Sequence, residues 1–289
     1  MARRAQQWLL ALGLLCGLTA QAAGPVWAVR GAHNTVYLAG SMHLLPAEDA
    51  TLPASFQRAY RDSSRLVMEM DLGKLDADAA GSWMLAHGTL PPGTQLRGVI
   101  GEARYARVAS AAEQLGLPLV ALDHMAPWMV GIELTELAYA NAGYDAEHGV
   151  EQQLLHEAEA DSKPTAGLET MQEELGGLAA LSREDQVRML EQTLEDLPDL
   201  KPQLREVLDA WRAGDAPRLG ELLAKEYRSF PSLFEPLVTA RNERWLPQVE
   251  ALLRGSDNAL VVVGALHVAG PGGLLERLRR DGFSVRQLD

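Results

Sequence analysis

The stretch ALVVVGALH, residues 259–267, sets the fold: an apolar run, then a glycine, then a histidine three residues later. A continuous apolar run of this length predicts a β-strand buried on both faces, as in parallel sheets. Gly272–Arg280 predicts a helix that Gly282 ends, and Phe283–Arg286 predicts a further strand. Together these segments predict a compact βαβ unit.

Five more segments have the composition of strands. Val26–Val29 and Thr35–Leu38 are separated by turn residues, which predicts a hairpin. The other three are Arg65–Met70, Leu117–Ala121 and Lys163–Leu168. Because these strands are far apart in the chain, the sheet must be assembled from distant segments.

Most of the remaining chain has apolar residues at three- and four-residue spacing, which predicts helices. The predicted helices are Met125–Ala142, Glu147–Ala160, Arg183–Leu197, Gln203–Arg212, Ala216–Tyr227 and Leu233–Leu253. Residues 170–255 contain no convincing strand, so this helix-rich region forms a helical layer or a helical lobe. The fold class is therefore α/β or mixed α+β, in a single domain over residues 23–289.

Residues 1–22 have the three parts of a secretory signal peptide. Arg3 and Arg4 give the basic start, Trp8–Leu18 is apolar, and Ala20-Gln21-Ala22 offers small residues for cleavage. The apolar part is shorter than the roughly 20 residues that a membrane span needs. We therefore expect an exported protein, periplasmic or secreted, without stable membrane insertion after cleavage.

The mature chain is expected to be acidic and free of cysteine. The formal net charge is −13, and loss of the two signal arginines makes it −15 (−13 − 2). Nucleic acid is therefore an unsuitable partner, since its affinity depends on neutralised phosphates. The one cysteine, Cys16, lies inside the signal, which leaves no disulfide and no thiolate for catalysis or zinc binding. The oligomeric state cannot be read from the sequence.

Two turns share one design, in which an apolar strand ends at glycine and histidine follows three residues later. They are Gly40-Ser41-Met42-His43 and Gly264-Ala265-Leu266-His267. Glycine allows a sharp turn, and the side chains beyond it project over the carboxyl edge of the sheet, where α/β folds place ligands. Imidazole is the commonest metal ligand and general base. One such turn is a weak signal, whereas two at the best strand ends favour a shared site.

Glu69 and Arg241 are further candidates. Glu69 ends an otherwise apolar run, where a carboxylate needs a cation, a metal or a proton. It is a metal ligand or general base, or else a strand-end carboxylate that faces solvent or pairs with arginine. Arg241, within a predicted helix, could hold a substrate carboxylate or stabilise an oxyanion. A surface position is the commoner one for a helical arginine.

Two more glutamates leave alternatives open. Glu169 is either a site carboxylate or part of a helix cap, in which Thr170 is the N-cap and Glu173 completes the capping box. Glu151 could be a metal ligand together with His148 at helical spacing, or the one inward carboxylate of a solvated helix face.

In their order along the chain, these segments resemble the TraB/PrgY/GumN family, over about residues 25–289. The resemblance rests on Tyr37–Leu44 with Pro46, Val67-Met68-Glu69, Gly149-Val150-Glu151, Gly167–Thr170, Arg241-Asn242 and Val261–Leu274. Two positions depart from it: Ser41 stands where many members have threonine, and Glu151 where many bacterial members have aspartate. Ser41 keeps the hydroxyl group of threonine, and Glu151 keeps the negative charge of aspartate.

The resemblance implies a fold, a metal and a set of roles. The family includes the TIKI proteins, which look like metal-dependent proteases, and its fold resembles that of erythromycin-esterase and ChaN-like proteins, a mixed sheet wrapped by helices. It implies metal ligands among His43, His267, Glu69 and Glu151. It implies catalytic or supporting roles for Glu69, Glu169, Arg241 and Asn242.

The leading hypothesis is an exported hydrolase that cuts peptide bonds in a peptide or protein substrate with a divalent metal ion. Mixed nitrogen and oxygen ligands without thiolate suit Mn, Co or Zn. One alternative is a non-enzymatic protein that sequesters a peptide or another ligand. Another is a metal- or haem-binding protein on the same fold, which rests on fold analogy alone.

Overall fold

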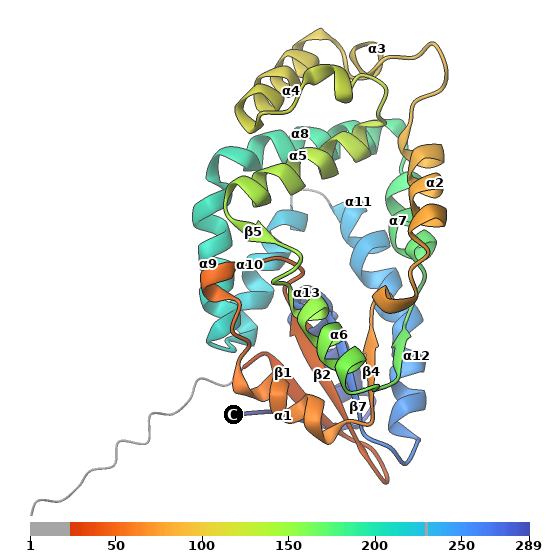
Figure 1. Ribbon diagram of the computed structural model, residues 1–289, viewed down its shortest axis with the longest axis vertical. Helices are drawn as coiled ribbons and strands as arrows, with labels where there is room; N and C mark the ends of the chain where they lie inside the picture. The colour runs from red at the N-terminus through yellow and green to blue at the C-terminus, as the bar shows by residue number, and fades with distance from the viewer. Residues whose placement is uncertain (1–23, 229–230) are drawn as a thin grey trace, which may run out of the picture.

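The computed structural model describes residues 24–228 and 231–289, and its centre is a six-stranded sheet (Figure 1). The predicted signal peptide, residues 1–22, lies outside the described residues. No helix within the described ranges is long and apolar enough to cross a membrane. The class is mixed α/β, a central mixed sheet surrounded by helices, as predicted.

The sheet has the order β6-β4-β7-β2-β1-β8. Its strands are β1 (Val26–Arg30), β2 (Thr35–Ser41), β4 (Arg65–Met68), β6 (Thr165–Gly167), β7 (Ala259–Gly264) and β8 (Ser284–Gln287). The pairs β2/β7, β7/β4 and β4/β6 are parallel, and β1 is antiparallel to both of its neighbours. Five strands therefore run in one direction, and the carboxyl ends of β2, β7, β4 and β6 meet at one edge.

The strand predictions are confirmed except one. The hairpin pairs Val26 with Ala39, and β7 connects to β8 through α13 (Ala265–Ala269) and α14 (Leu274–Arg280). This βαβ unit is wider than predicted, because β2 and β1 lie between its two strands. A separate two-stranded sheet joins β3 (Leu45–Pro46) to β5 (Tyr144–Asp145).

The strand predicted at Leu117–Ala121 is wrong. Leu119–Ala121 forms the short 3-10 helix η3, away from the sheet. The backbone N–H of Leu117 donates to Ala112 at the end of the preceding helix, and that of Ala121 donates to Pro118. Local turns use these backbone donors, and Pro118 has no N–H group. The apolar segment therefore lacks the free donors that pairing with a strand of the sheet requires.

Helices cover both faces of the sheet. Leu260 and Val262 of β7 face a core built with α1 (Ala54–Asp62), α6 (Val150–Ala160) and α9 (Leu200–Arg212). Val261 and Val263, which alternate with them, face α12 (Ala240–Leu253) and α14. Both faces of β7 are therefore buried, which explains its unbroken apolar sequence.

A helical lobe with its own apolar core stands beyond the carboxyl edge of the sheet, at the top of Figure 1. It contains α2 (Ala77–Gly88), α3 (Leu96–Ile100), α4 (Glu102–Leu115), α5 (Pro127–Asn141), α7 (Met171–Ala179) and α8 (Arg183–Asp196). Residues 170–255 are free of strands wherever the structure describes them, as predicted. The lobe also uses residues 77–141, which the prediction did not include.

Three further segments complete the region. They are α10 (Ala216–Arg228), α11 (Pro231–Phe234) and the π-helical turn η5 (Glu235–Thr239). Elsewhere in the described chain, short 3-10 helices lie at Ala47–Asp49, Leu72–Lys74 and Leu197–Asp199. The predicted helix Leu233–Leu253 is thus interrupted by η5 just before Arg241. π-Helical turns are rare and occur frequently at functional sites.

Trp211 of α9 joins the helical layer to the first glycine–histidine turn. Its ring is fully buried, and its Nε1–H donates to the carbonyl oxygen of Gly40 at 2.7 Å. We expect Trp211→Ala to lower the free energy of unfolding by about 3–5 kcal/mol, because it leaves a large cavity. Trp211→Phe should cost less, since it keeps most of the ring volume, although it loses part of the ring and the hydrogen bond, which is worth about 1 kcal/mol.

Urea denaturation measures both effects. Leu85→Ala is the control, because Leu85 is 71% exposed and its truncation should change the stability by no more than about 0.5 kcal/mol. A Trp211→Ala protein as stable as the control would contradict this account of the core.

Candidate active site

The predicted site residues meet where four parallel strands end. His43 follows β2, Glu69 follows β4, Glu169 follows β6 and His267 follows β7. The register aligns these ends, because Ser41 pairs with Gly264, and Met68 pairs with both Val262 and Gly167. The sheet therefore brings together side chains that are more than 200 residues apart in sequence.

The two turn glycines lie where little space is left for a side chain. A Cβ atom at Gly264 would lie 3.2 Å from Glu69 Oε1 and 3.4 Å from His43 Nε2. A Cβ atom at Gly40 would lie 3.2 Å from the Cα atom of Ala265, at the start of the second turn. The backbone at Gly264 is ordinary, with φ of −48°. A side chain at either position would push these neighbours aside by a few tenths of an ångström, so close approach, and not the sharp turn expected from the sequence, is what favours glycine here.

Arg241 lies at the centre of the cluster, so a surface position for it is wrong. Its Nη2 donates to Glu69 Oε2 at 2.5 Å, and its Nε donates to Glu169 Oε1 at 2.7 Å. Its Nη1 is 3.2 Å from His267 Nε2. The side chain is only 9% exposed. The sequence predicted that Glu69 needs a cation, a metal or a proton, and Arg241 supplies the cation from within the chain.

Glu69 is held as a carboxylate. Its Oε1 accepts from the backbone N–H of Gly264 at 2.6 Å, in addition to the contact with Arg241. Burial acts to raise its pKa, but the charges of His267, when protonated, and of Arg241 outweigh burial and lower the pKa to about 2. Glu69 is therefore ionised at neutral pH.

Glu169 anchors Arg241. Besides Arg241, its carboxylate accepts from Arg244 Nη2 at 3.1 Å and from Trp245 Nε1 at 3.2 Å. It does not form part of the helix cap, because Thr170 and Glu173 complete the capping box by themselves. Every contact of Glu169 fixes a neighbouring side chain, which makes it a positioning residue.

Glu174 of α7 is the site residue that sequence reasoning missed. Its Oε1 lies 3.6 Å from Arg241 Nη2, and oxygen atoms of Glu69, Glu169 and Glu174 lie within 4.8 Å of one another. Burial and the charge of Glu69 raise the pKa of Glu174 to about 7. The predicted cap at Thr170 placed it in the first turn of a helix, and the spacing of Met171, Leu175 and Leu178 is the signal that could have placed it on the inward face.

His267 is fixed as a neutral imidazole. Its Nδ1 lies 2.9 Å from Asn242 Oδ1, which can only accept, so Nδ1 carries the proton. Nε2 is then free of hydrogen and presents its lone pair to Arg241. Burial lowers the pKa of His267 to about 4, which agrees with this tautomer. A second partner that fixes the tautomer is typical of metal-binding histidines.

His43 pairs with Glu151 at the edge of the cluster. Its Nδ1 is 2.9 Å from Glu151 Oε1, which also accepts from the hydroxyl of Ser41. The negative charge of Glu151 raises the pKa of His43 above its ordinary value, although the imidazole is 60% exposed and water screens this attraction. His148, considered above as a ligand with Glu151, instead contacts Asp145 at 2.6 Å.

Among the described residues, the donor atoms close enough together to share one cation are carboxylate oxygens of Glu69, Glu169 and Glu174, and His43, His267 and Glu151 are not part of that group. An ion held by the predicted set would therefore need these side chains to move closer together.

In the described chain, Glu151 Oε2 and Glu174 Oε2 are buried without a hydrogen-bond partner, which a cation or a proton would supply. Imidazole and carboxylate donors suit Mn, Co or Zn. However, Arg241 already occupies Glu69 Oε2 and His267 Nε2, so an ion bound to these atoms requires Arg241 to withdraw.

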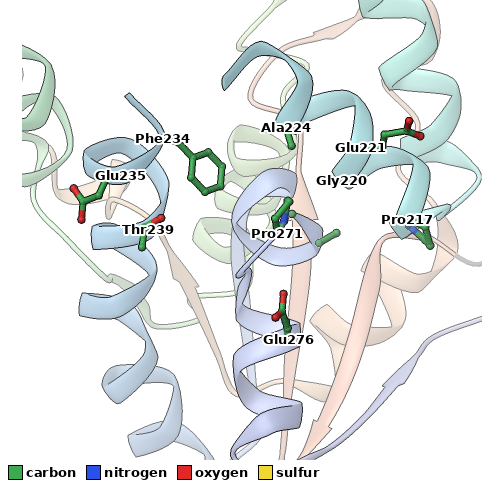
Figure 2. A pocket seen from close by; sticks show the side chains of 11 residues that line it. Pro217, Gly220, Glu221, Ala224, Phe234, Glu235, Thr239, Pro271 and Glu276 are labelled. Carbon is green, nitrogen blue, oxygen red and sulfur yellow. The ribbon is translucent and has the colours of Figure 1, made fainter. Parts of the chain in front are cut away.

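Two cavities adjoin the cluster, and His43 and Glu174 line both. One has a volume of about 400 Å³ and lies toward the helical lobe, and the other, of about 190 Å³, lies beside Glu69 and Glu151. A larger hollow of about 600 Å³ lies between α10, η5 and the loop after α13, with Phe234, Pro271 and Glu276 in its walls (Figure 2). It contains none of the predicted site residues, so the two smaller cavities mark the site.

Comparison with known proteins identifies relatives along nearly the whole chain. A model of the TraB/PrgY/gumN family matches residues 25–287. The proteins named YbaP from Escherichia coli (strain K12) and Shigella flexneri, both described as uncharacterized, are each 25% identical over 243 residues. The match covers 84% of this chain and 87% of each relative. No solved structure matches the chain.

Arg241→Met removes the cation that neutralises the buried carboxylates. Because uncompensated buried charge is costly, we expect the chelator-treated protein to lose about 3–5 kcal/mol of unfolding free energy at pH 8. The loss should shrink as the pH falls. In the native protein, the stabilisation from Glu69 is present above the ordinary glutamate pKa and disappears as the pH approaches 2, whereas the variant lacks this contribution at every pH.

Urea denaturation at several pH values tests this expectation. Arg254→Met is the matched control, because Arg254 lies at the end of the same helix and is 65% exposed. It should change the stability by less than about 0.5 kcal/mol. Equal losses in both variants, or a loss in Arg241→Met that does not vary with pH, would contradict the proposed role of the cation.

Proposed function

The chain belongs to the TraB/PrgY/gumN family, and we propose that it is a divalent-metal-dependent hydrolase that acts on peptide bonds. The observation that carries the proposal is the convergence of His43, His267 and Glu69 at one sheet edge, next to buried carboxylate oxygens without partners. Unpaired buried carboxylates are costly unless a cation or a proton reaches them. A divalent ion meets that need and brings hydrolytic chemistry.

In this proposal, His43, His267, Glu69 and Glu151 hold the ion. When bound, a divalent ion would polarise the scissile carbonyl and lower the pKa of a coordinated water molecule. Asn242 keeps the proton of His267 on Nδ1, which directs the lone pair of Nε2 toward the cluster. Ser41 holds the carboxylate of Glu151 from the opposite side to its free oxygen.

Two other side chains act on the substrate. Glu174 is best placed to move a proton, because it lines both cavities and its Oε2 has no partner in the described chain. A pKa near 7 agrees with that role. Arg241, once withdrawn from Glu69 and His267, presents a charged donor to the substrate carbonyl or carboxylate. Glu169 keeps Arg241 within reach.

Metal analysis of purified protein, combined with peptide cleavage, tests the proposal. We expect about one divalent ion per chain, peptide cleavage that stops with a chelator, and recovery on addition of Mn, Co or Zn. His43→Ala and His267→Ala should each lose at least tenfold in metal affinity and in cleavage rate. His33→Ala is the control, because His33 is exposed in the hairpin turn. A metal-free protein whose cleavage survives both substitutions would refute the proposal.

Peptide binding without hydrolysis is the second candidate. The observation that favours it is that Arg241 already neutralises Glu69 and Glu169 and fills the lone pair of His267. Glu69, Glu169 and His267 are then paired without an ion, and a proton could satisfy the remaining oxygen atoms of Glu151 and Glu174. Tight peptide binding that survives removal of metal, with no turnover over a long incubation, would select this candidate.

We also propose that the protein is exported and acts outside the cytoplasm. Support comes from residues 1–22, whose basic, apolar and small-residue parts match a signal peptide. Mass spectrometry of protein from the extracytoplasmic fraction should find a chain that begins at Ala23. Leu14→Arg should block both export and cleavage, because it places a charge within the apolar part. A full-length chain that stays in the cytoplasm would contradict export.

A further inference from the structure

The larger cavity beside the cluster has a charged end and an apolar remainder. Glu174 and Arg241 give that end its charge, and Ser41, His43 and His267 add polar atoms beside them. Of the other lining residues, only Tyr139 and Gln203 carry polar side-chain atoms. The rest are glycine, alanine and larger apolar residues, among them Met42, Leu175, Leu178, Leu204, Val207, Leu223, Leu237 and Leu266.

The apolar walls come from both halves of the molecule. Leu175 and Leu178 belong to α7 of the lobe, Leu204 and Val207 to α9, and Leu237 to η5. The cavity therefore lies between the lobe and the edge of the sheet. Several of these side chains stay half-buried although they belong to otherwise closed cores. Apolar surface left facing water favours an apolar occupant, by about 25 cal/mol for each Å² covered.

We propose that this cavity is the subsite for an uncharged apolar side chain of the peptide substrate, next to the bond at the cluster. That the occupant belongs to a substrate rests on the proposed function. That it is apolar rests on the residues that line the cavity. A volume of about 400 Å³ falls within the range of ligand pockets, roughly 300–1,000 Å³. Leucine, methionine and phenylalanine are side chains of the right chemistry.

Charged substrate side chains do not suit the apolar part of this cavity. Away from the cluster, the described lining holds no lysine, arginine, aspartate or glutamate. A charged substrate side chain would lose its hydration there and gain no counter-ion. The hollow in Figure 2 is unlike it, since Glu221, Glu235 and Glu276 stand in its walls and it lies outside the cluster.

The smaller cavity beside Glu69 also has apolar lining, from Met68, Met70 and Leu72, but its volume is about 190 Å³. Of these three cavities in the described chain, the one toward the lobe offers the largest apolar wall next to the reactive groups, with a volume of about 400 Å³.

Binding and turnover of one peptide series test the subsite. The probes are acetyl-Gly-Ala-Xaa-Ala-Gly-amide with Leu, Phe, Ser or Asp as Xaa. Calorimetry on the chelator-treated full chain gives each Kd, and cleavage with added metal gives each kcat/KM. We expect Leu and Phe to bind at least tenfold more tightly than Ser and Asp.

Variants assign the preference to the cavity. Val207→Asn should reduce the Leu-to-Ser ratio at least fivefold, and Val207→Thr, which keeps the shape of the side chain, should reduce it in the same direction. Leu222→Asn is the control, because Leu222 is a half-buried apolar residue of α10 outside the cavity lining. It should leave the ratio unchanged. Thermal unfolding of each variant checks that the chain is folded.

The outcomes separate this inference from the proposed function. A preference for Leu and Phe that Val207→Thr weakens, without any turnover, supports the subsite and refutes the hydrolase. Turnover with equal preference for Ser, or a preference that both Val207 variants keep, refutes the subsite and leaves the hydrolase standing. Absence of both binding and turnover for every peptide refutes both.

Discussion

The site depends on one buried cation, the guanidinium of Arg241. It contacts Glu69 after β4, Glu169 after β6 and His267 after β7, so a single side chain joins three strand ends. Buried ion pairs contribute little net stability, because desolvation offsets much of their attraction, although removing one partner is costly. The cluster is therefore better explained by the position it gives each group than by the stability it adds.

An ion bound as proposed would compete with Arg241 for the same atoms. Glu69 Oε2 and His267 Nε2 receive the guanidinium, and these two atoms would also bind an ion placed between the two glycine–histidine turns. Withdrawal of Arg241 need not leave it unpaired, since Glu169 holds it through Nε and Glu174 is close by. Metal binding, as proposed, would thus convert a structural arginine into a substrate-binding one.

The sequence predicts those parts of the fold and site that depend on local chemistry or on a general rule. The apolar run of β7, the hairpin and the capping box of Thr170 and Glu173 are local signals. The meeting of His43 and His267 follows from parallel strands ending at one edge. The π-helical turn before Arg241 and the failed strand at Leu117–Ala121 depend instead on tertiary packing. For Glu174 a signal did exist, because Met171, Leu175 and Leu178 have the spacing of an inward apolar face and Glu174 lies on that face.

The position of the charged cluster at the end of an apolar cavity connects binding to chemistry. A substrate side chain that fills this cavity would displace water beside Arg241 and Glu174. Lower local polarity strengthens the interaction of a guanidinium with the carbonyl it faces, and it raises the cost of leaving any carboxylate unpaired. The occupant would therefore favour both an ion at the cluster and a substrate on Arg241. A charged or small side chain would leave water in place, so the same cavity that selects the substrate would also set the strength of the electrostatics that act on it.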